Sequence, residues 1–565
     1  MKEKLSEYLK GVVSVFGADI AVPNLDYPEN PEHGDFSTNT AMANAKKLGM
    51  SPKVLADKIV LECKKNMPEF IRDISIAGPG FINFFIKDQF IAEEVLNVGK
   101  NYGKFDKENG KKVLVEYTDP NTFKVFHIGH LMSNSIGESL SRLVEYSGTS
   151  VTRICYPSDI GLHIAKSVWA VQKHIDEMPK ESAPIQERTD FLGKMYVFGT
   201  KAYDDDANAK TEIDALNKVL YDKTDPKVNE LYEKGRKWSL DHFELLYKTL
   251  GTKFDDYIYE SEMASIGLAT VSSNLGKVFE KSEGAVVFKG EEYGLHTRVF
   301  VNAHGIPTYE AKDLGLNITK FKKYPTTDQS IIVTASEQND YFRVLTKVIS
   351  LIDEKNGSKT KHIGHGMMRF LSGKMSSRTG NVITAEALLQ DIKDLVKEKI
   401  KDREFSAGEA EELSEMIAVG AIKYTILRSS VGSDIIFDSS ASISFEGDSG
   451  PYLQYSAVRA NSIIEKAEKE GITKDIILPE SVNLIEKLIT RFPDIVMRAK
   501  DGYAPQIIAN YLITLSGAFN SFYASQIIVD KNNKLSPYYI SLTKAFLITM
   551  TNGLWILGIK VPKKM

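Results

Sequence analysis

Two histidines one turn apart stand in the motif PNTFKVFHIGHL, at residues 120–131. His127 and His130 can each donate a hydrogen bond to a phosphate oxygen, and Lys124 adds a positive charge just before them. Gly129 has no side chain, so an adenine ring or a phosphate can approach the backbone closely. These residues predict a nucleotide site. The alternative, two ordinary surface or core histidines, is disfavoured by the strand–turn–helix context of the motif.

The elements around the motif are those that can position it. A buried strand begins at 113–115, the turn 118–121 follows, and apolar residues spaced by three or four predict a helix over 128–144. Gly148 closes this helix, and 151–156 is a second strand. A strand–helix–strand unit indicates a parallel sheet that binds ligands at the carboxyl ends of its strands. There the backbone donors and the dipole of the helix point at the same place.

A second candidate loop, SGKMSSRTGN at 372–381, combines Gly, Ser and Lys in a way that can fold over a triphosphate, with Lys374 as the charge that meets it. The word HIGH recurs at 362–365. It follows a charged loop and no helix start lies behind it, so we interpret it as a decoy. Variants of His362 and His365 are therefore expected to be nearly silent.

Composition limits the alternatives further. The chain has 565 residues, of which 42% are hydrophobic and 26% charged, as in a globular protein of several domains. Its two cysteines, Cys63 and Cys155, exclude a disulfide framework and a cysteine-rich zinc site. No signal peptide or membrane-spanning run is readable, which predicts a cytoplasmic protein without a membrane partner.

Charge is distributed unevenly along the chain. The net charge is −4, yet residues 451–565 carry 14 Lys and Arg against 9 Asp and Glu, which gives them +5 and leaves −9 on the rest. A basic C-terminal unit on an acidic body is compatible with a polyanionic partner. A charge of this size over such a length is also common by chance, so it is a weak indication.

The two motifs together resemble the class I aminoacyl-tRNA synthetases: HIGH follows a first strand, and KMSSR comes about 250 residues later. Further segments are similar, in order along the whole chain, to the arginyl-tRNA synthetase family. They are HGDFSTN (33–39), VEYTDPNTFKVFHIGHL (115–131), TYEAKDLG (308–315), GPYLQYSAVRANSI (450–463), NYLITLSGAFNSFY (510–523) and NGLWILGIKVPKKM (552–565).

This resemblance implies an α/β fold with three domains. They are a small α+β N-terminal domain that contacts tRNA (1–110), a Rossmann-like parallel-sheet catalytic domain with a helical insertion at about 170–255 (111–390), and an all-helical anticodon-binding domain (391–565). The implied activity is that of an arginine–tRNA ligase, which forms arginyl-adenylate from ATP and L-arginine and passes the arginyl group to tRNA-Arg. The family also implies Mg²⁺ with the ATP, no protein-bound metal, and a monomer.

The resemblance also implies the site residues. Catalysis falls to Lys124, His127, Gly129, His130 and Lys374, and ATP binding adds Phe126, Met375 and Ser376. Arginine binding falls to Glu116, Asn121, Tyr309, Asp313 and Gln338, and tRNA binding to Tyr455 and Arg459. Chemistry supports the acidic residues, because a guanidinium presents a planar fork of donors that pairs with carboxylates. Tyr309 and Asp313 stand four residues apart on one helical face; the alternative is a plain surface pair.

The chain departs from the family pattern at two positions. Ser377 stands where the class I loop has a second lysine, and Tyr341 where the arginine family commonly has histidine. The division of phosphate stabilisation between Lys124 and Lys374 therefore stays open. Two rivals are a cysteine synthetase, which needs thiolate zinc ligands that the chain lacks, and a non-catalytic RNA-binding relative, which is expected to have lost motif residues.

Overall fold

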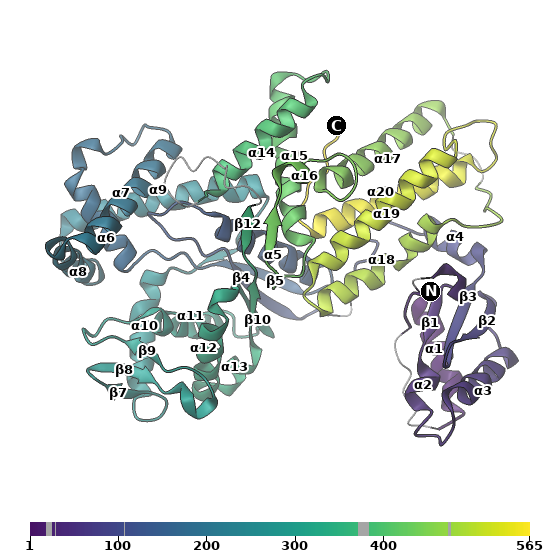
Figure 1. The fold of residues 1–565 in the computed structure, drawn as a ribbon, viewed down its shortest axis with the longest axis horizontal. Helices are drawn as coiled ribbons and strands as arrows, with labels where there is room; N and C mark the ends of the chain where they lie inside the picture. The colour runs from purple at the N-terminus through teal and green to yellow at the C-terminus, as the bar shows by residue number, and fades with distance from the viewer. Residues whose placement is uncertain (18–24, 29, 107, 371–382, 473–475) are drawn as a thin grey trace. The chain divides into compact units, whose positions relative to one another are not determined.

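The computed structural model describes residues 1–17, 25–28, 30–106, 108–370, 383–472 and 476–565 (Figure 1). These residues form two compact units, each described by itself. One comprises Met1–Tyr102, Arg459–Asp494 and Thr514–Met550, and the other comprises Gly103–Val458, Ile495–Ile513 and Thr551–Met565. The helices α17 (Gly450–Glu470), α18 (Leu484–Asp501), α19 (Pro505–Ser525) and α20 (Ser536–Ile556) each contribute residues to both units. The domain boundaries expected from the sequence stay predictions.

The first unit holds a small antiparallel sheet in the order β1-β3-β2. Its strands are β1 (Phe36–Thr38), β2 (Ile71–Ala77) and β3 (Phe81–Ile86), and its N-terminal helices are α1 (Lys2–Ser14), α2 (Thr40–Asn44), α3 (Pro52–Lys65) and α4 (Asp88–Leu96), with the 3₁₀ turn η1 (Pro31–His33). Apolar residues of α1, α3 and the strands, such as Leu5, Ile59 and Phe84, form its core. This part has the α+β character that the sequence predicted.

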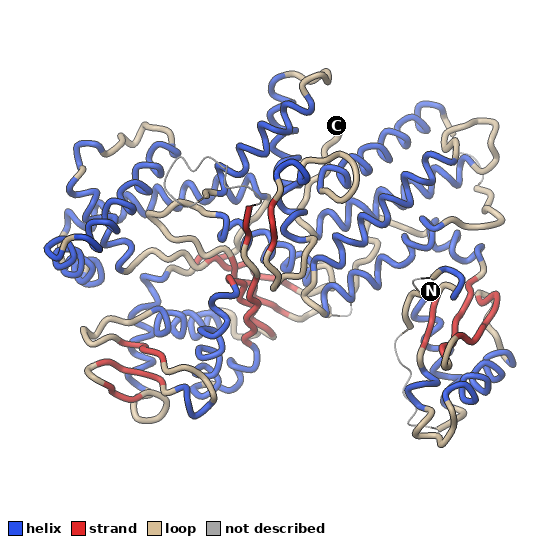
Figure 2. The backbone as a smooth tube through the Cα atoms, in the orientation of Figure 1, coloured by secondary structure: helices blue, strands red, loops and turns tan. Residues whose placement is uncertain are grey.

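The second unit is built on a five-stranded sheet in the order β11-β10-β4-β5-β6. Figure 2 draws the strands in red. Every neighbouring pair is parallel, which confirms the predicted parallel sheet. The strands are β4 (Lys112–Tyr117), β5 (Ser150–Cys155), β6 (Asp256–Tyr257), β10 (Gln329–Ala335) and β11 (Thr360–His365). Because all five run the same way, their carboxyl ends lie at one edge, where a ligand site is expected.

Helix α5 (Ile128–Glu145) connects β4 to β5 and packs directly on the sheet. A methyl group at Gly137 would overlap the Tyr117 ring, so glycine lets the helix approach β4 closely.

Further elements surround the sheet. The insertion helices are α6 (Leu162–Lys173), α7 (Ile185–Asp205), α8 (Ala207–Asp222) and α9 (Pro226–Leu250), with η2 (Ile175–Glu177) between α6 and α7 and a shared core that includes Trp238. A second group comprises α10 (Glu260–Ser273), β7 (Glu280–Ser282), β8 (Ala285–Phe288), η3 (Gly290–Tyr293), β9 (Arg298–Val301), α11 (Tyr309–Lys323), η4 (Ser336–Gln338), α12 (Asn339–Ile352) and α13 (Glu354–Lys359). The last group comprises β12 (Met368–Phe370), α14 (Ala385–Ile400), α15 (Ala407–Leu427), β13 (Ile435–Phe437) and α16 (Ser439–Ser442).

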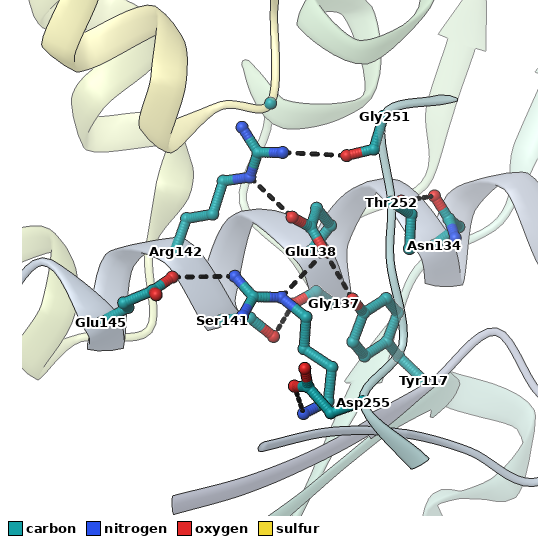
Figure 3. Close-up of polar contacts among 12 residues, drawn as sticks. Tyr117, Asn134, Gly137, Glu138, Ser141, Arg142, Glu145, Gly251, Thr252 and Asp255 are labelled. Atoms are coloured by element: carbon teal, nitrogen blue, oxygen red, sulfur yellow. Dashed lines mark hydrogen bonds and ion pairs between the residues drawn. The ribbon is translucent and has the colours of Figure 1, made fainter. Parts of the chain in front are cut away.

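A buried ion-pair network fixes α5 in place (Figure 3). Glu138 on α5 bonds Nε of Arg142 at 2.6 Å and Nε of Arg153 on β5 at 3.2 Å, and accepts the Tyr117 hydroxyl at 2.5 Å. Burial pushes the pKa of Glu138 up, but the two arginines outweigh it and hold that pKa below its ordinary value. Arg142 also donates to the carbonyl of Gly251 at 2.9 Å. The helix is therefore tied to β4, β5 and the end of α9.

Helices α10 and α11 pack backbone against backbone through a glycine. A methyl group at Gly267 on α10 would overlap the carbonyl oxygen of Ala311 on α11. We therefore predict that Gly267→Ala forces the helices apart and lowers the free energy of unfolding by about 1–3 kcal/mol. Thermal unfolding followed by circular dichroism measures this. Gly408→Ala on α15, where a methyl group meets nothing, is the matched control, and equal melting temperatures for both variants would contradict the prediction.

Candidate active site

A cavity of about 540 Å³ opens at the carboxyl ends of β4, β5, β10 and β11. It is lined by eight of the residues that the sequence singled out: Glu116, Asn121, His127, Gly129, His130, Tyr309, Asp313 and Gln338. They come from β4 and the turn after it, from α5, from α11 and from η4. The sequence motifs, more than 200 residues apart at their extremes, thus converge on one pocket.

The two histidines are held by the start of α5. Nδ1 of His127 accepts the Gly129 N–H at 3.1 Å, and Nδ1 of His130 accepts the His127 N–H at 3.3 Å. The rings stack with their centroids 3.7 Å apart. Because each Nδ1 is an acceptor, the proton of each neutral ring is placed on Nε2. The same side chains that cap the helix therefore keep one N–H each for a ligand.

The surroundings favour the neutral form of both rings. Burial, together with the charge of Lys124, lowers the pKa of His127 to about 4. Burial also lowers the pKa of His130 well below its ordinary value. Near pH 7 the pair thus offers two uncharged Nε2–H donors beside the positive end of the helix dipole.

The turn between β4 and α5 is strained. Thr118 and Asp119 adopt positive φ angles of 80° and 44°, which side-chain-bearing residues rarely do. Ser133 accepts the Thr118 N–H at 2.9 Å, and an Asp119 oxygen accepts the Tyr156 N–H at 2.7 Å. These bonds hold the backbone in a conformation that it would otherwise leave, and both sides of the turn line the cavity.

Two of the carboxylates in the wall are already paired. Glu116 bonds Nζ of Lys320 at 2.6 Å, and both side chains are buried. Glu260 bonds Nζ of Lys312 at 2.5 Å and also accepts the Ser158 hydroxyl. Burying a carboxylate is costly unless a cation or several donors compensate it. Glu116, expected to contact the ligand, therefore has its charge balanced from within the protein.

Asp313 differs from both. Its Oδ2 accepts the Tyr341 hydroxyl at 2.5 Å, and among the described residues no cation lies within ion-pair distance of it. Burial is the main cause that raises the pKa of Asp313 to about 7, and the nearby Glu116 and Glu260 add to it. Asp313 is thus a partly buried carboxyl group with a raised pKa and no ion-pair partner among the described residues.

Tyr309 stands beside Asp313, as its spacing predicted. The ring is 54% exposed and Nζ of Lys312 lies 4.5 Å from its centroid. Both Tyr309 and Asp313 line the cavity from the first turns of α11, which favours the ligand face over a plain surface pair.

Other expected residues lie differently. Lys124 does not line the cavity, and its Nζ sits 4.6 Å from the ring of Tyr196 on α7. Phe126 is fully buried and packs against His130 with ring centroids 5.1 Å apart, so it supports the histidine from the core side. Lys374, Met375 and Ser376 lie outside the described residues.

The second HIGH word forms most of β11, so it does not begin a helix, as expected. His362 accordingly stacks on Phe342 at 4.1 Å and bonds the Thr334 hydroxyl at 2.8 Å, without lining the cavity. His365 does line it, at the carboxyl end of the strand. The near-silence expected of His365 variants stays a prediction.

Sequence reasoning missed several lining residues, among them Glu260, Arg298 and His365, and it named Tyr341 without assigning it a role. One signal was available for His365, because the last residue of a parallel strand reaches the ligand edge. Glu260 begins α10 and Arg298 begins β9, and neither position carries a local motif.

The residues expected to contact RNA lie on α17. Arg459 donates to the Asn520 side chain at 2.6 Å and its guanidinium lies 5.2 Å from the Tyr523 ring centroid. Tyr455 is half-buried. Phe519 packs on Phe546 in the core, with their ring centroids 3.9 Å apart. RNA contact by Tyr455 and Arg459 stays a prediction.

No three His, Cys, Asp or Glu side chains of the described ranges gather closely enough to hold a metal ion. Within the same ranges, no helix combines the length and the apolar character needed to span a bilayer.

Three family models match the chain in succession. They are the arginyl tRNA synthetase N terminal domain over residues 1–86, the catalytic domain of tRNA synthetases class I (R) over 92–439, and the DALR anticodon binding domain over 453–565.

Individual proteins match over their full length. The arginine–tRNA ligase of Borrelia hermsii is 30% identical over 100% of both chains, and that of Clostridium acetobutylicum is 32% identical over 96% of both. Among solved structures, Thermus thermophilus arginyl-tRNA synthetase superimposes with a TM-score of 0.84 at 21% identity and 100% coverage of both chains. The Plasmodium falciparum enzyme gives 0.79 at 21% identity, covering 100% of this chain and 99% of that one. At these identities the two structures establish the fold.

The pairing of Glu116 with Lys320 predicts a coupled effect on stability. Lys320→Met leaves the Glu116 carboxylate buried without its cation and should cost about 3–5 kcal/mol. Glu116→Gln added to Lys320→Met removes that unpaired charge, so the double variant should be more stable than Lys320→Met alone. Urea unfolding of the single and double variants measures this. Losses that simply add would show that the two groups do not interact.

Proposed function

The chain belongs to the class I arginyl-tRNA synthetase family and is an arginine–tRNA ligase, and from this premise we propose that arginine and ATP meet in the cavity at the start of α5. ATP is the family's energy source. In this proposal the arginine carboxylate attacks the α-phosphorus, pyrophosphate leaves, and the arginyl group then passes to the 3′ end of tRNA-Arg.

One observation carries the placement of arginine. Asp313 lies partly buried in the cavity wall with no cation beside it among the described residues, whereas Glu116 and Glu260 are neutralised by Lys320 and Lys312. A guanidinium that enters supplies the missing positive charge together with its hydrogen-bond donors. Asp313 is therefore proposed as the group that binds the arginine side chain.

Neighbouring residues complete the proposed arginine site. Tyr309 lies four residues before Asp313, with its exposed ring available to cover the ligand. Asn121 and Gln338 offer amide groups for the arginine α-amino and carboxylate groups.

The ATP phosphates are assigned to the histidine pair. His127 and His130 each offer Nε2–H where the dipole of α5 also favours negative charge. Gly129 leaves the backbone open to the nucleotide. Fixed donors of this kind stabilise charge that develops on phosphate oxygens as pyrophosphate leaves.

Two lysines are candidates for additional phosphate charge. Lys124 lies over the Tyr196 ring and stands three residues before His127 in the same motif. Lys374 lies outside the described residues, but Ile383, nine positions later, accepts the Ile128 N–H at 3.3 Å beside the histidine motif. This anchoring supports a role for Lys374 together with its neighbours Met375 and Ser376.

Mg²⁺ fits as a companion of the nucleotide. Mg²⁺ in nucleotide sites is held mainly by phosphate oxygens and water, with few protein ligands. When bound, it neutralises phosphate charge.

The C-terminal DALR domain binds tRNA-Arg, and we propose Tyr455 and Arg459 on α17 as its contacts. A cytoplasmic monomer is part of the same proposal, and light scattering tests the monomer.

Pyrophosphate exchange with each of the twenty amino acids, with and without tRNA, tests the activity as a whole. Exchange with arginine and with no other amino acid supports the proposed activity. A protein that binds tRNA-Arg but shows no exchange with any amino acid would favour the non-catalytic alternative.

His130→Ala should lower the rate of arginyl-adenylate formation by about 10²–10³, because it removes one fixed donor to the developing charge. ATP–pyrophosphate exchange measures the rate, and circular dichroism checks the fold. His362→Ala, on β11 and outside the cavity, is the control, and its exchange rate should stay within about threefold of wild type. Near-normal exchange by His130→Ala would remove His130 from the mechanism.

Asp313→Asn should raise the arginine KM by about 10²-fold or more and leave the ATP KM unchanged, since only the guanidinium loses a charge partner. In the wild type, the arginine KM should rise about tenfold for each pH unit below about 7, because the protonated carboxyl cannot pair with the cation. The asparagine variant should lose this dependence. An arginine KM that stays independent of pH in the wild type would place the charge partner elsewhere.

A further inference from the structure

Tyr341 lines the same cavity as Asp313 and is hydrogen-bonded to it. It lies in the first turn of α12, and its hydroxyl donates to Oδ2 of Asp313 at 2.5 Å. Its ring lies edge-on to Phe342 at 5.0 Å, and the Arg298 guanidinium is 5.7 Å from its centroid. These two contacts restrain the ring, which favours a fixed direction for its hydroxyl.

This contact leaves the two carboxyl oxygens of Asp313 unequal. Oδ2 is occupied by Tyr341, while Oδ1 makes no hydrogen bond to any described residue, and Asp313 lines the cavity. A carboxylate with one oxygen anchored cannot turn freely about its last bond. The other oxygen is then held at a fixed position for a ligand.

We propose that Tyr341 is a positioning residue for arginine: its hydroxyl anchors Oδ2 of Asp313, presents Oδ1 to the guanidinium, and stabilises the charged carboxylate. The proposal rests on the proposed function of the pocket. It also accounts for a tyrosine at a position where the family commonly has histidine, because both side chains can donate a hydrogen bond.

The hydrogen bond from Tyr341 also affects the protonation of Asp313, because charged groups surround this carboxyl group. Titratable and charged groups surround it on the neighbouring elements: Glu116 on β4, Asp119 in the turn after β4, Tyr156 after β5, Glu260 on α10, Arg298 on β9, Tyr309 and Lys312 on α11, and Tyr341 on α12. Burial and the two glutamates oppose ionisation of Asp313, whereas the Tyr341 hydrogen bond and Lys312 favour it. Loss of the hydroxyl should therefore shift Asp313 toward its protonated form.

The test is Tyr341→Phe, which removes one oxygen atom. The arginine KM at pH 7 should rise about 10- to 100-fold, as expected for losing a hydrogen bond to a charged group. The turnover rate at saturating arginine and the ATP KM should stay within about threefold of wild type. The midpoint of the KM-against-pH profile should move to higher pH. Tyr324→Phe, which deletes a tyrosine–aspartate bond to Asp256 (2.8 Å) outside the pocket, is the matched control.

A second replacement of Tyr341 keeps the proposal testable if the phenylalanine variant does not fold. Meta-fluorotyrosine at position 341 has nearly the same shape and donates more strongly, so the profile should move to lower pH. Profiles that match the control in both variants would overturn the proposal, as would a parallel fall in turnover and ATP affinity. Absence of arginine activation in the wild type would instead refute the proposed function.

Discussion

The arrangement of the site depends on how the protein compensates carboxylates that are buried at the edge of its sheet. Helix α11 supplies Lys312 for Glu260 and Lys320 for Glu116. The same helix places Asp313 between these lysines without a cation of its own. An uncompensated buried charge is costly, so in the proposed account Asp313 favours its protonated form until the guanidinium of arginine displaces the proton. The proposed selectivity for a cationic side chain follows from this imbalance.

On the side of the pocket proposed for the phosphates, hydrogen bonds within the protein also fix the side chains in advance. His127 and His130 use Nδ1 to satisfy backbone donors at the start of α5, and this fixes Nε2–H toward the ligand. The helix itself cannot shift easily, because Glu138 binds it to Arg153 on the neighbouring strand. The donors are therefore in place before ATP arrives, and little reorganisation is needed during the reaction.

The sequence predicted the local parts of this site well. The strand and helix around the histidine motif lie within a few residues of their expected bounds, since apolar spacing reports local burial. It could not predict that Lys320 neutralises Glu116 from 204 residues away or that Tyr341 bonds Asp313, because both pairs form only when the elements assemble. Lys124 is a motif residue that the sequence placed in the site, yet its side chain lies over the Tyr196 ring on α7. This contact also forms only when the elements assemble.

Counting the protons released when arginine binds tests the central claim most directly. Calorimetric titration in two buffers of different ionisation enthalpy gives this number at each pH. With the pKa of Asp313 raised to about 7, nearly one proton should leave per arginine bound at about pH 6, and almost none at about pH 8.5. Arginine that binds at pH 6 without releasing a proton would contradict the account.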